Sequence, residues 1–217
     1  MTDWSPLWLS LRVAATALVV VAPLGTLLGY AQSRAQSRLA LLLDALLLLP
    51  LVLPPSVTGY YLLVLFGRHG VFGSALQKFG VTIVFTFWGA ALASAVVALP
   101  LMVKTAQAAF TGVDPDLEEV AYTLGLSRMR TFFAVTLPQA RAGLLAATTL
   151  AFARAVGEFG ATLLFAGNIP GKTNTAPLEI YASLQVGDDG RAAALTLGLT
   201  LISVVVVLVA GRFARVA

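Results

Sequence analysis

Cysteine is absent from this sequence of 217 residues, and histidine occurs only once. Without thiols the chain can form neither a disulfide framework nor a thiolate metal site. The single histidine, His69, lies beside Arg68 and Gly70 and cannot build a metal centre by itself. We interpret it as a loop residue and expect no metal site in this chain.

Charged residues are also scarce, at 11% of the sequence, whereas about 25% is usual for a soluble domain. Hydrophobic residues make up 59%, and the mean hydropathy is +0.89. A chain this apolar cannot cover its own surface with polar groups, so we expect lipid to be its solvent. The net charge of +4 therefore predicts cations retained on the cytoplasmic side of a membrane, and no binding of nucleic acid.

A membrane-spanning helix needs about 20 mostly apolar residues. Five runs approach or exceed this length, at residues 13–31, 39–66, 81–103, 142–165 and 192–210. Trp4 and Trp8 precede the first run and suit the aromatic belt at a membrane interface. The N-terminus has no basic region typical of a cleavable signal peptide. The sequence thus predicts an all-α transmembrane bundle of five spans that forms one domain over residues 1–217.

The second apolar run is interrupted by Pro50, Pro54 and Pro55, so a kinked or broken helix is expected there. Broken helices occur in membranes where protein or a water-filled path satisfies the freed backbone groups. Both a pathway-lining role and a simple packing kink fit this pattern. Residues 67–80 and 166–191 are glycine-rich or turn-rich and are expected to be loops.

Residues 114–138 form the one densely charged stretch, flanked by apolar runs. Asp114 is expected to cap a helix, Gly125 to end it, and Ser127 to cap a second helix that Pro138 closes. This helix–turn–helix would expose an apolar side for packing or docking, and we interpret Glu118 and Glu119 as solvated. Leu117, Val120, Ala121, Leu124 and Leu126 make up that side. A DNA-binding motif fits the spacing, but the stretch is too small to bury a core of its own.

The distribution of cations predicts the topology. If residues 114–138 are cytoplasmic, eight cations lie on that side and five on the other, with Arg154 inside a span. The cytoplasmic set is Arg34, Arg38, Lys104, Arg128, Arg130, Arg141, Arg212 and Arg215. The N-terminus is then outside the cell membrane and the C-terminus in the cytoplasm.

One ionisable pair lies within a span. Arg154 and Glu158 are four residues apart and share a helix face. Intramembrane charges usually face a bundle interior or a cavity, so the pair fits a translocation path or a subunit interface. A self-neutralising pair that fixes packing is the slightly favoured alternative. Other polar candidates for a path are Ser94, Thr196, Thr200 and Ser203, although such side chains often bond their own helix.

The sequence has no catalytic constellation and no phosphate-binding loop. Lys172 follows Gly171 and precedes Thr173, but Ala166 occupies the place of the first glycine of that motif. We therefore expect a transport subunit rather than an enzyme. An ion-coupled secondary transporter that uses Arg154 and Glu158 as a relay is the alternative from the residues alone.

Glu119-Val120-Ala121, Gly125 and Leu137-Pro138 resemble the EAA motif of permease subunits of binding-protein-dependent ABC importers of the type I class. In that family the motif forms a cytoplasmic coupling helix that docks on an ATPase. Val120 departs from the motif's alanine. The resemblance implies an ATPase-coupling segment at about residues 105–140. Its candidate contact residues are Glu118, Glu119, Ala121, Leu124, Gly125, Leu126 and Ser127.

Residues 49–70, 98–114 and 153–173 further resemble molybdate permeases, and sulfate/thiosulfate permeases share much of the pattern. The resemblance implies import of molybdate or tungstate, with sulfate or thiosulfate as the alternative. It also implies a homodimer in the cell inner membrane, two ATPase subunits on the cytoplasmic face and an oxyanion-binding protein outside. ATP and magnesium would bind the ATPase, and this chain would bind no cofactor.

Overall fold

The computed structural model describes residues 3–35 and 37–216, and this part of the chain is helical with no β-strand. Its elements in order are α1 (Ser5–Arg34), α2 (Arg38–Val52), α3 (Pro55–Phe66), α4 (Val71–Gln77), α5 (Phe87–Thr111), α6 (Pro115–Thr123), α7 (Arg128–Thr131), a π-helical turn η1 (Phe132–Thr136), α8 (Leu137–Val156), α9 (Gly160–Ala166), α10 (Ala176–Gln185) and α11 (Asp189–Val216). The predicted all-α class is confirmed.

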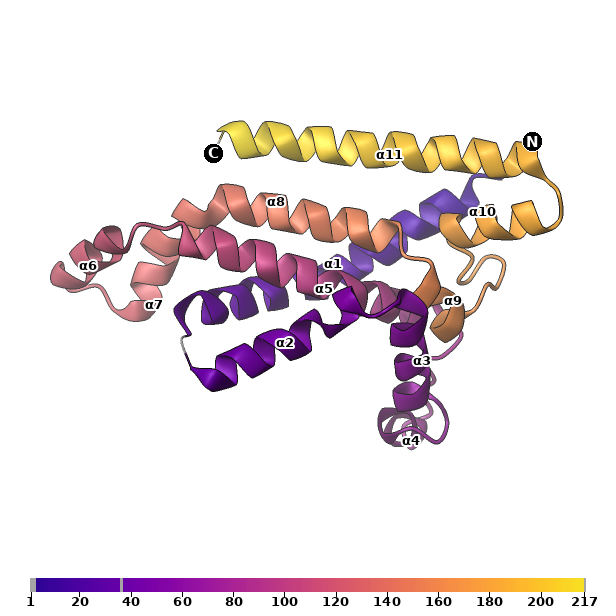
Figure 1. The fold of residues 1–217 in the computed structure, drawn as a ribbon, viewed down its shortest axis with the longest axis horizontal. Coiled ribbons are helices and arrows are strands. Elements are labelled where there is room, and N and C mark those ends of the chain that lie inside the picture. Colours follow the sequence, from indigo (N-terminus) through magenta and orange to yellow (C-terminus); the bar gives the residue numbers. More distant parts are fainter. Residues whose placement is uncertain (1–2, 36, 217) are drawn as a thin grey trace.

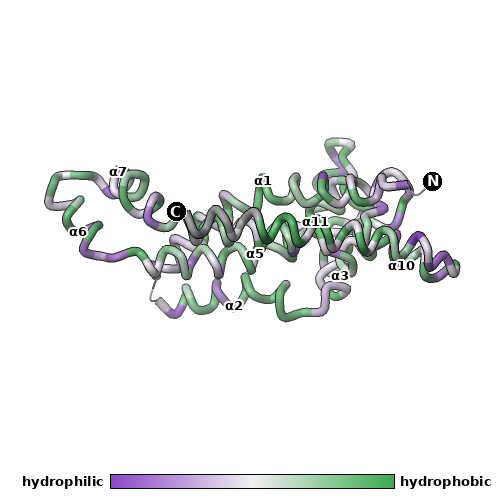
Figure 2. The backbone as a smooth tube through the Cα atoms, turned by 90° about the horizontal axis from the view of Figure 1, so that it is seen from above, coloured by the Kyte–Doolittle hydropathy of each residue, from purple (hydrophilic) through white to green (hydrophobic). Residues whose placement is uncertain are grey.

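The long helices lie side by side, and the charged segment α6–α7 extends beyond one end of the bundle (Figure 1). The N-terminus and α10 lie at the opposite end. Apolar sequence covers most of the long helices, and hydrophilic residues gather in the segments at the two ends (Figure 2). The arrangement is that of a membrane protein with a polar region at each end.

Three helices are long and apolar enough to cross a membrane, and two bent pairs raise the number to five. The three are α1, α5 and α11. The pairs are α2–α3, bent by 111°, and the helix at Arg128–Val156 with α9, bent by 58°. The expected break in the second span is therefore confirmed, and it falls before Pro54 and Pro55, where two consecutive prolines remove backbone donors.

Several expected boundaries were wrong. The stretch 67–80 contains α4, the stretch 166–191 contains α10, and the third span begins at Phe87, six residues after Val81. Pro138 does not end a helix, since Arg128 to Val156 runs on through η1. The wider π-helical turn lies directly before Pro138, where the missing N–H would disrupt a regular α-helical ladder.

The core lies where α5 packs between α1 and α8. It is built largely from alanine and a few large residues, and Met102 and Phe110 are almost fully buried. Small residues let helix backbones approach closely, which is the usual packing mode in membranes. By contrast, α2 has no buried residue, and most of its leucines are exposed. Lipid or another subunit must cover that surface.

Gly29 shows how tightly α1 meets α5. A Cβ added there would lie 2.7 Å from Ala106 Cβ and 2.8 Å from the backbone nitrogen of Gln107. We expect Gly29→Ala to destabilise the protein by about 1–3 kcal/mol, because the backbone of α5 cannot yield as a flexible side chain would. Thermal unfolding in detergent measures the loss. Gly112→Ala is the matched control, since its nearest neighbour would be at 3.6 Å, and equal melting of both variants would contradict this packing.

Candidate functional site

The charged segment 114–138 begins with a capped helix, as predicted. The Asp114 carboxylate accepts a hydrogen bond of 3.0 Å from the backbone N–H of Asp116, and Pro115 occupies the first turn of α6. Ser127 likewise caps α7 by accepting from the N–H of Arg130 at 3.4 Å. These local bonds fix both helix starts within the segment itself.

Gly125 makes the turn between α6 and α7. Its φ is +82°, in the left-handed region that favours glycine. The N–H of Leu126 donates to the carbonyl of Ala121 at 3.1 Å, and the N–H of Gly125 donates to Tyr122 at 3.0 Å. These bonds satisfy carbonyls at the end of α6. A Cβ at Gly125 would meet no atom of this chain within 4 Å, so the turn is open toward the outside.

The segment exposes an apolar surface, but it does so with only part of the expected residues. Leu117, Val120 and Leu124 are exposed, and Leu124 is 74% accessible. Ala121, expected on the same side, is only 4% exposed and packs inward. Sequence reasoning missed Met129 and Phe133, which are 67% and 59% exposed. They line an open cavity of about 450 Å³ together with Leu126, Arg130 and Ala134.

Glu118 was expected to be solvated, and this was wrong. The residue is 7% exposed, and its Oε1 accepts a hydrogen bond from Thr136 Oγ1 at 2.6 Å. Arg34 Nη2 lies 2.5 Å from the same oxygen. Glu118 therefore joins α6 to the end of α1 and to η1. Glu119, its neighbour, is exposed.

Aromatic rings pack next to the junction formed by Glu118, Arg34 and Thr136. Tyr30 packs against Phe110 and Phe132, with ring centroids 5.2 and 4.7 Å apart. The Arg34 guanidinium lies 5.6 Å from the Tyr30 ring centroid, a favourable cation–π distance. α1, α5, α6 and η1 thus meet at one ion pair and one ring cluster.

Arg154 and Glu158 form the predicted pair at a break in the fourth span. Arg154 Nη1 lies 2.8 Å from Glu158 Oε2, and the Glu158 side chain is 1% exposed. The second carboxylate oxygen accepts from the backbone N–H of Ala161 at 2.8 Å. Glu158 therefore neutralises the charge of Arg154 in the last turn of α8 and caps the start of α9. Both contacts give it a structural function in this conformation.

The breaks in the two bent spans meet each other. A Cβ at Gly160 would lie 3.0 Å from Pro55 Cβ, and one at Gly59 would lie 2.8 Å from Ala161 Cα. α3 and α9 therefore pack with their backbones almost in contact. The Arg154–Glu158 pair lies beside this crossing of α3 and α9. A pathway-lining role and a packing kink, the two interpretations of the broken second span, therefore both concern the region around this pair.

The other path candidates lie on α5 and α11. Ser94 is 1% exposed inside α5. Thr196 and Thr200 donate to the carbonyls of Ala192 and Thr196 at 2.8 Å, so each bonds its own helix. Their role in a path stays a prediction. Within residues 3–35 and 37–216, no three His, Cys, Asp or Glu side chains are grouped to hold a metal.

We expect replacement of Glu158 to have a graded effect. Glu158→Gln keeps an oxygen for the Ala161 N–H but loses the charge that pairs with Arg154, whereas Glu158→Ala loses both. Loss of a helix cap costs about 1 kcal/mol, and the unpaired Arg154 adds to this. Melting temperatures should therefore fall in the order wild type, Gln, Ala. Equal melting of all three would show that the pair carries no structural function.

Comparison with known proteins decides the family. Residues 22–216 match the model of the binding-protein-dependent transport system inner membrane component. The chain belongs to this family. It is thus an inner-membrane transport component rather than an enzyme.

Two curated relatives are molybdenum transport permeases. The chain is 44% identical to the molybdenum transport system permease protein ModB of Escherichia coli, over 94% of this chain and 91% of that protein. It is 45% identical to the putative molybdenum transport system permease protein YvgM of Bacillus subtilis, over 92% and 88%. A sulfate transport system permease protein, CysT of Salmonella typhimurium, is 40% identical over 71% of this chain and 56% of that protein.

Solved structures of importers share the fold. The inward-facing MetNI methionine ABC transporter matches with a TM-score of 0.73 over 98% of this chain and 93% of that chain. The sequence identity is 19%, so this likeness bears on the fold alone. It agrees with the type I importer permease architecture that the EAA-like motif implied.

Proposed function

We propose that this chain is the membrane-spanning permease subunit of an ATP-driven importer of molybdate, with the similar dianion tungstate as a second substrate. The carrying observation is 44–45% identity to molybdenum permeases over more than nine-tenths of this chain. The sulfate permease aligns over only 71% of the chain. An extracytoplasmic binding protein would deliver the anion.

The proposal includes a homodimer driven by two ATPase subunits on the cytoplasmic face, as membership of the importer family implies. The segment 114–138 offers exposed apolar side chains at one end of the bundle, and Glu118 ties that segment to α1 and η1. ATP-driven closure of the ATPases would move the 114–138 segments of the two copies together. That motion would tilt the helices joined to each segment. The binding protein would then release its anion at the opposite end, and the distribution of cations favours an N-terminus on that outer side.

Labelled molybdate uptake tests this proposal. Cells lacking the chain should regain uptake when it is restored, and excess tungstate but not sulfate should block it. Restored sulfate uptake without molybdate uptake would still indicate an importer, but one whose substrate is sulfate. The 40% identity to a sulfate permease makes sulfate the alternative substrate. Uptake that persists without ATP and collapses with an uncoupler would instead indicate an ion-coupled transporter.

A further inference from the structure

We propose that a pocket formed by Arg12 and Lys172 binds the phosphate group of an acidic phospholipid at the membrane interface. The pocket lies where the starts of α1 and α5 meet the turn at Gly171, and its volume is about 370 Å³. This lies within the usual range of small-molecule sites, about 300–1,000 Å³. Its lining is Leu9, Arg12, Phe85, Thr86, Phe87, Trp88, Gly171 and Lys172.

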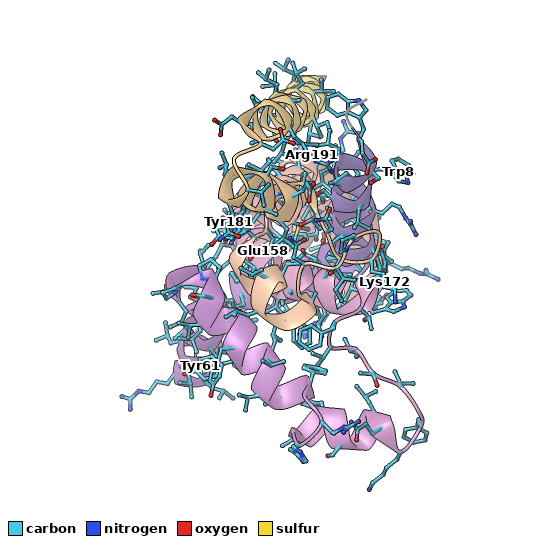
Figure 3. The ribbon with its side chains drawn as sticks, turned by 90° about the vertical axis from the view of Figure 1, so that its right-hand side faces the viewer. Trp8, Tyr61, Glu158, Lys172, Tyr181 and Arg191 are labelled. Carbon is cyan, nitrogen blue, oxygen red and sulfur yellow. The ribbon has the colours of Figure 1, made fainter. Side chains whose placement is uncertain are left out.

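Both cations are available to an external anion. Among the described residues the ion pairs use Arg34, Lys104, Arg154 and Arg191, and neither Arg12 nor Lys172. Arg12 and Lys172 are exposed. The Arg12 guanidinium lies 5.3 Å from the Phe87 ring centroid, which holds it at the pocket wall without neutralising it. Figure 3 shows Lys172 on the same side as Trp8, at the outer surface of the bundle.

The pocket has a fixed frame. Lys172 lies in a turn in which its own N–H donates to Ile169 at 3.0 Å. Thr173, fully buried, donates to the Gly167 carbonyl and accepts from the Ile169 N–H, both at 2.9 Å. Phe85 has a φ of +59°, an uncommon value for a large residue. The surrounding structure holds Phe85 in this conformation, as its N–H donates to Phe165 at 3.2 Å.

The position of the pocket favours a lipid over a free oxyanion. All three tryptophans of the chain are more than half exposed: Trp4 directly precedes α1, and Trp8 and Trp88 lie in the first turns of α1 and α5. Exposed tryptophans mark the level of the lipid headgroups. The pocket opens at that level, where phospholipid phosphates are abundant.

An apolar track for an acyl chain continues from the cation. Val19 and Val20 follow Arg12 by seven and eight residues, so they lie on the same face of α1 two turns further on. They are 74% and 58% exposed. A phosphate held by Arg12 and Lys172 would therefore place its acyl chain along this face, a feature that a transported dianion has no use for.

Titration of short-chain phosphatidylglycerol into the intact purified transporter, read by native mass spectrometry, tests the site. Phosphatidylcholine is the neutral comparison. Each cation near an anionic lipid is worth about fivefold in affinity, so Arg12→Gln with Lys172→Gln should weaken phosphatidylglycerol binding roughly 25-fold. Arg12→Lys with Lys172→Arg keeps both charges and should retain most of the binding, which separates charge loss from misfolding.

Arg68→Gln with Lys78→Gln is the matched control, since it removes two exposed cations on either side of α4 but leaves this pocket's lining intact. It should change affinity less than about twofold by the same reasoning. An equal fall in the control, or unchanged binding in the Gln variant, overturns the proposal. Displacement of phosphatidylglycerol by added molybdate would assign the pocket to the transported anion, and loss of binding-protein affinity alone would assign it to that partner. Lipid binding is measured without substrate, so its outcome is independent of whether molybdate is transported.

Discussion

Gly125→Asp is expected to abolish transport while the chain stays folded in the membrane. Gly125 has a left-handed backbone, and no atom of this chain lies within 4 Å of an added Cβ. The cost within the chain is therefore only about 1 kcal/mol of backbone strain. A charged side chain would instead project into the space of the docked ATPase. If the site is an interface hot spot, ATPase affinity should fall about 30-fold or more.

Gly187→Asp is the matched control for this variant. Gly187 also has a positive φ, +77°, and an added Cβ there meets nothing within 4 Å. It lies between α10 and α11, at the other end of the molecule from α6. Both variants should melt alike, and only Gly125→Asp should lose ATPase binding and uptake. Normal uptake by Gly125→Asp, or equal loss in the control, would remove Gly125 from the coupling assignment.

Glu118→Gln is expected to separate ATP hydrolysis from transport. Glutamine can still accept from Thr136, but it loses the ion pair with Arg34, whose side chain is 37% exposed. We expect a stability loss of about 1–2 kcal/mol, at the lower end for a charged hydrogen bond because of that exposure. Motion of α6 would then reach α1 less completely, so fewer anions would be imported for each ATP hydrolysed.

Two further variants sharpen this test. Glu119→Gln, on the exposed neighbour, should leave the melting temperature unchanged and affect only ATPase docking. Combining Glu118→Gln with Arg34→Gln should cost little more than either change alone, because both remove the same pair. Additive losses in stability would show that Arg34 and Glu118 act independently, and the junction would then have no part in coupling.

The local features of the coupling segment could be predicted from the sequence because their causes are local. Asp114, Gly125 and Ser127 act on backbone groups two to four residues away, and the structure confirms each one. The partner of Glu118 could not be found in this way. Arg34 is 84 residues distant, and only the tertiary fold brings the two together.

The breaks in the two bent spans also divide into one with a local cause and one with a tertiary cause. Consecutive prolines predict the break between α2 and α3, whereas the break after Val156 has only glycine as its local signal. It depends on Glu158 capping α9 and on close contact with Pro55, both of which are tertiary. Pro138 was misinterpreted for the related reason that a π-helical turn can accommodate a proline that would otherwise end the helix.

Molybdate accumulation in proteoliposomes tests the central claim most directly. Vesicles would contain this chain with its ATPase, with molybdate-loaded binding protein on the outer side and ATP on the ATPase side. The account predicts accumulation that needs ATP, survives an uncoupler and disappears with Gly125→Asp but not with Gly187→Asp. Accumulation without ATP, or its collapse by the uncoupler, would contradict the claim that this chain is the permease of an ATP-driven importer.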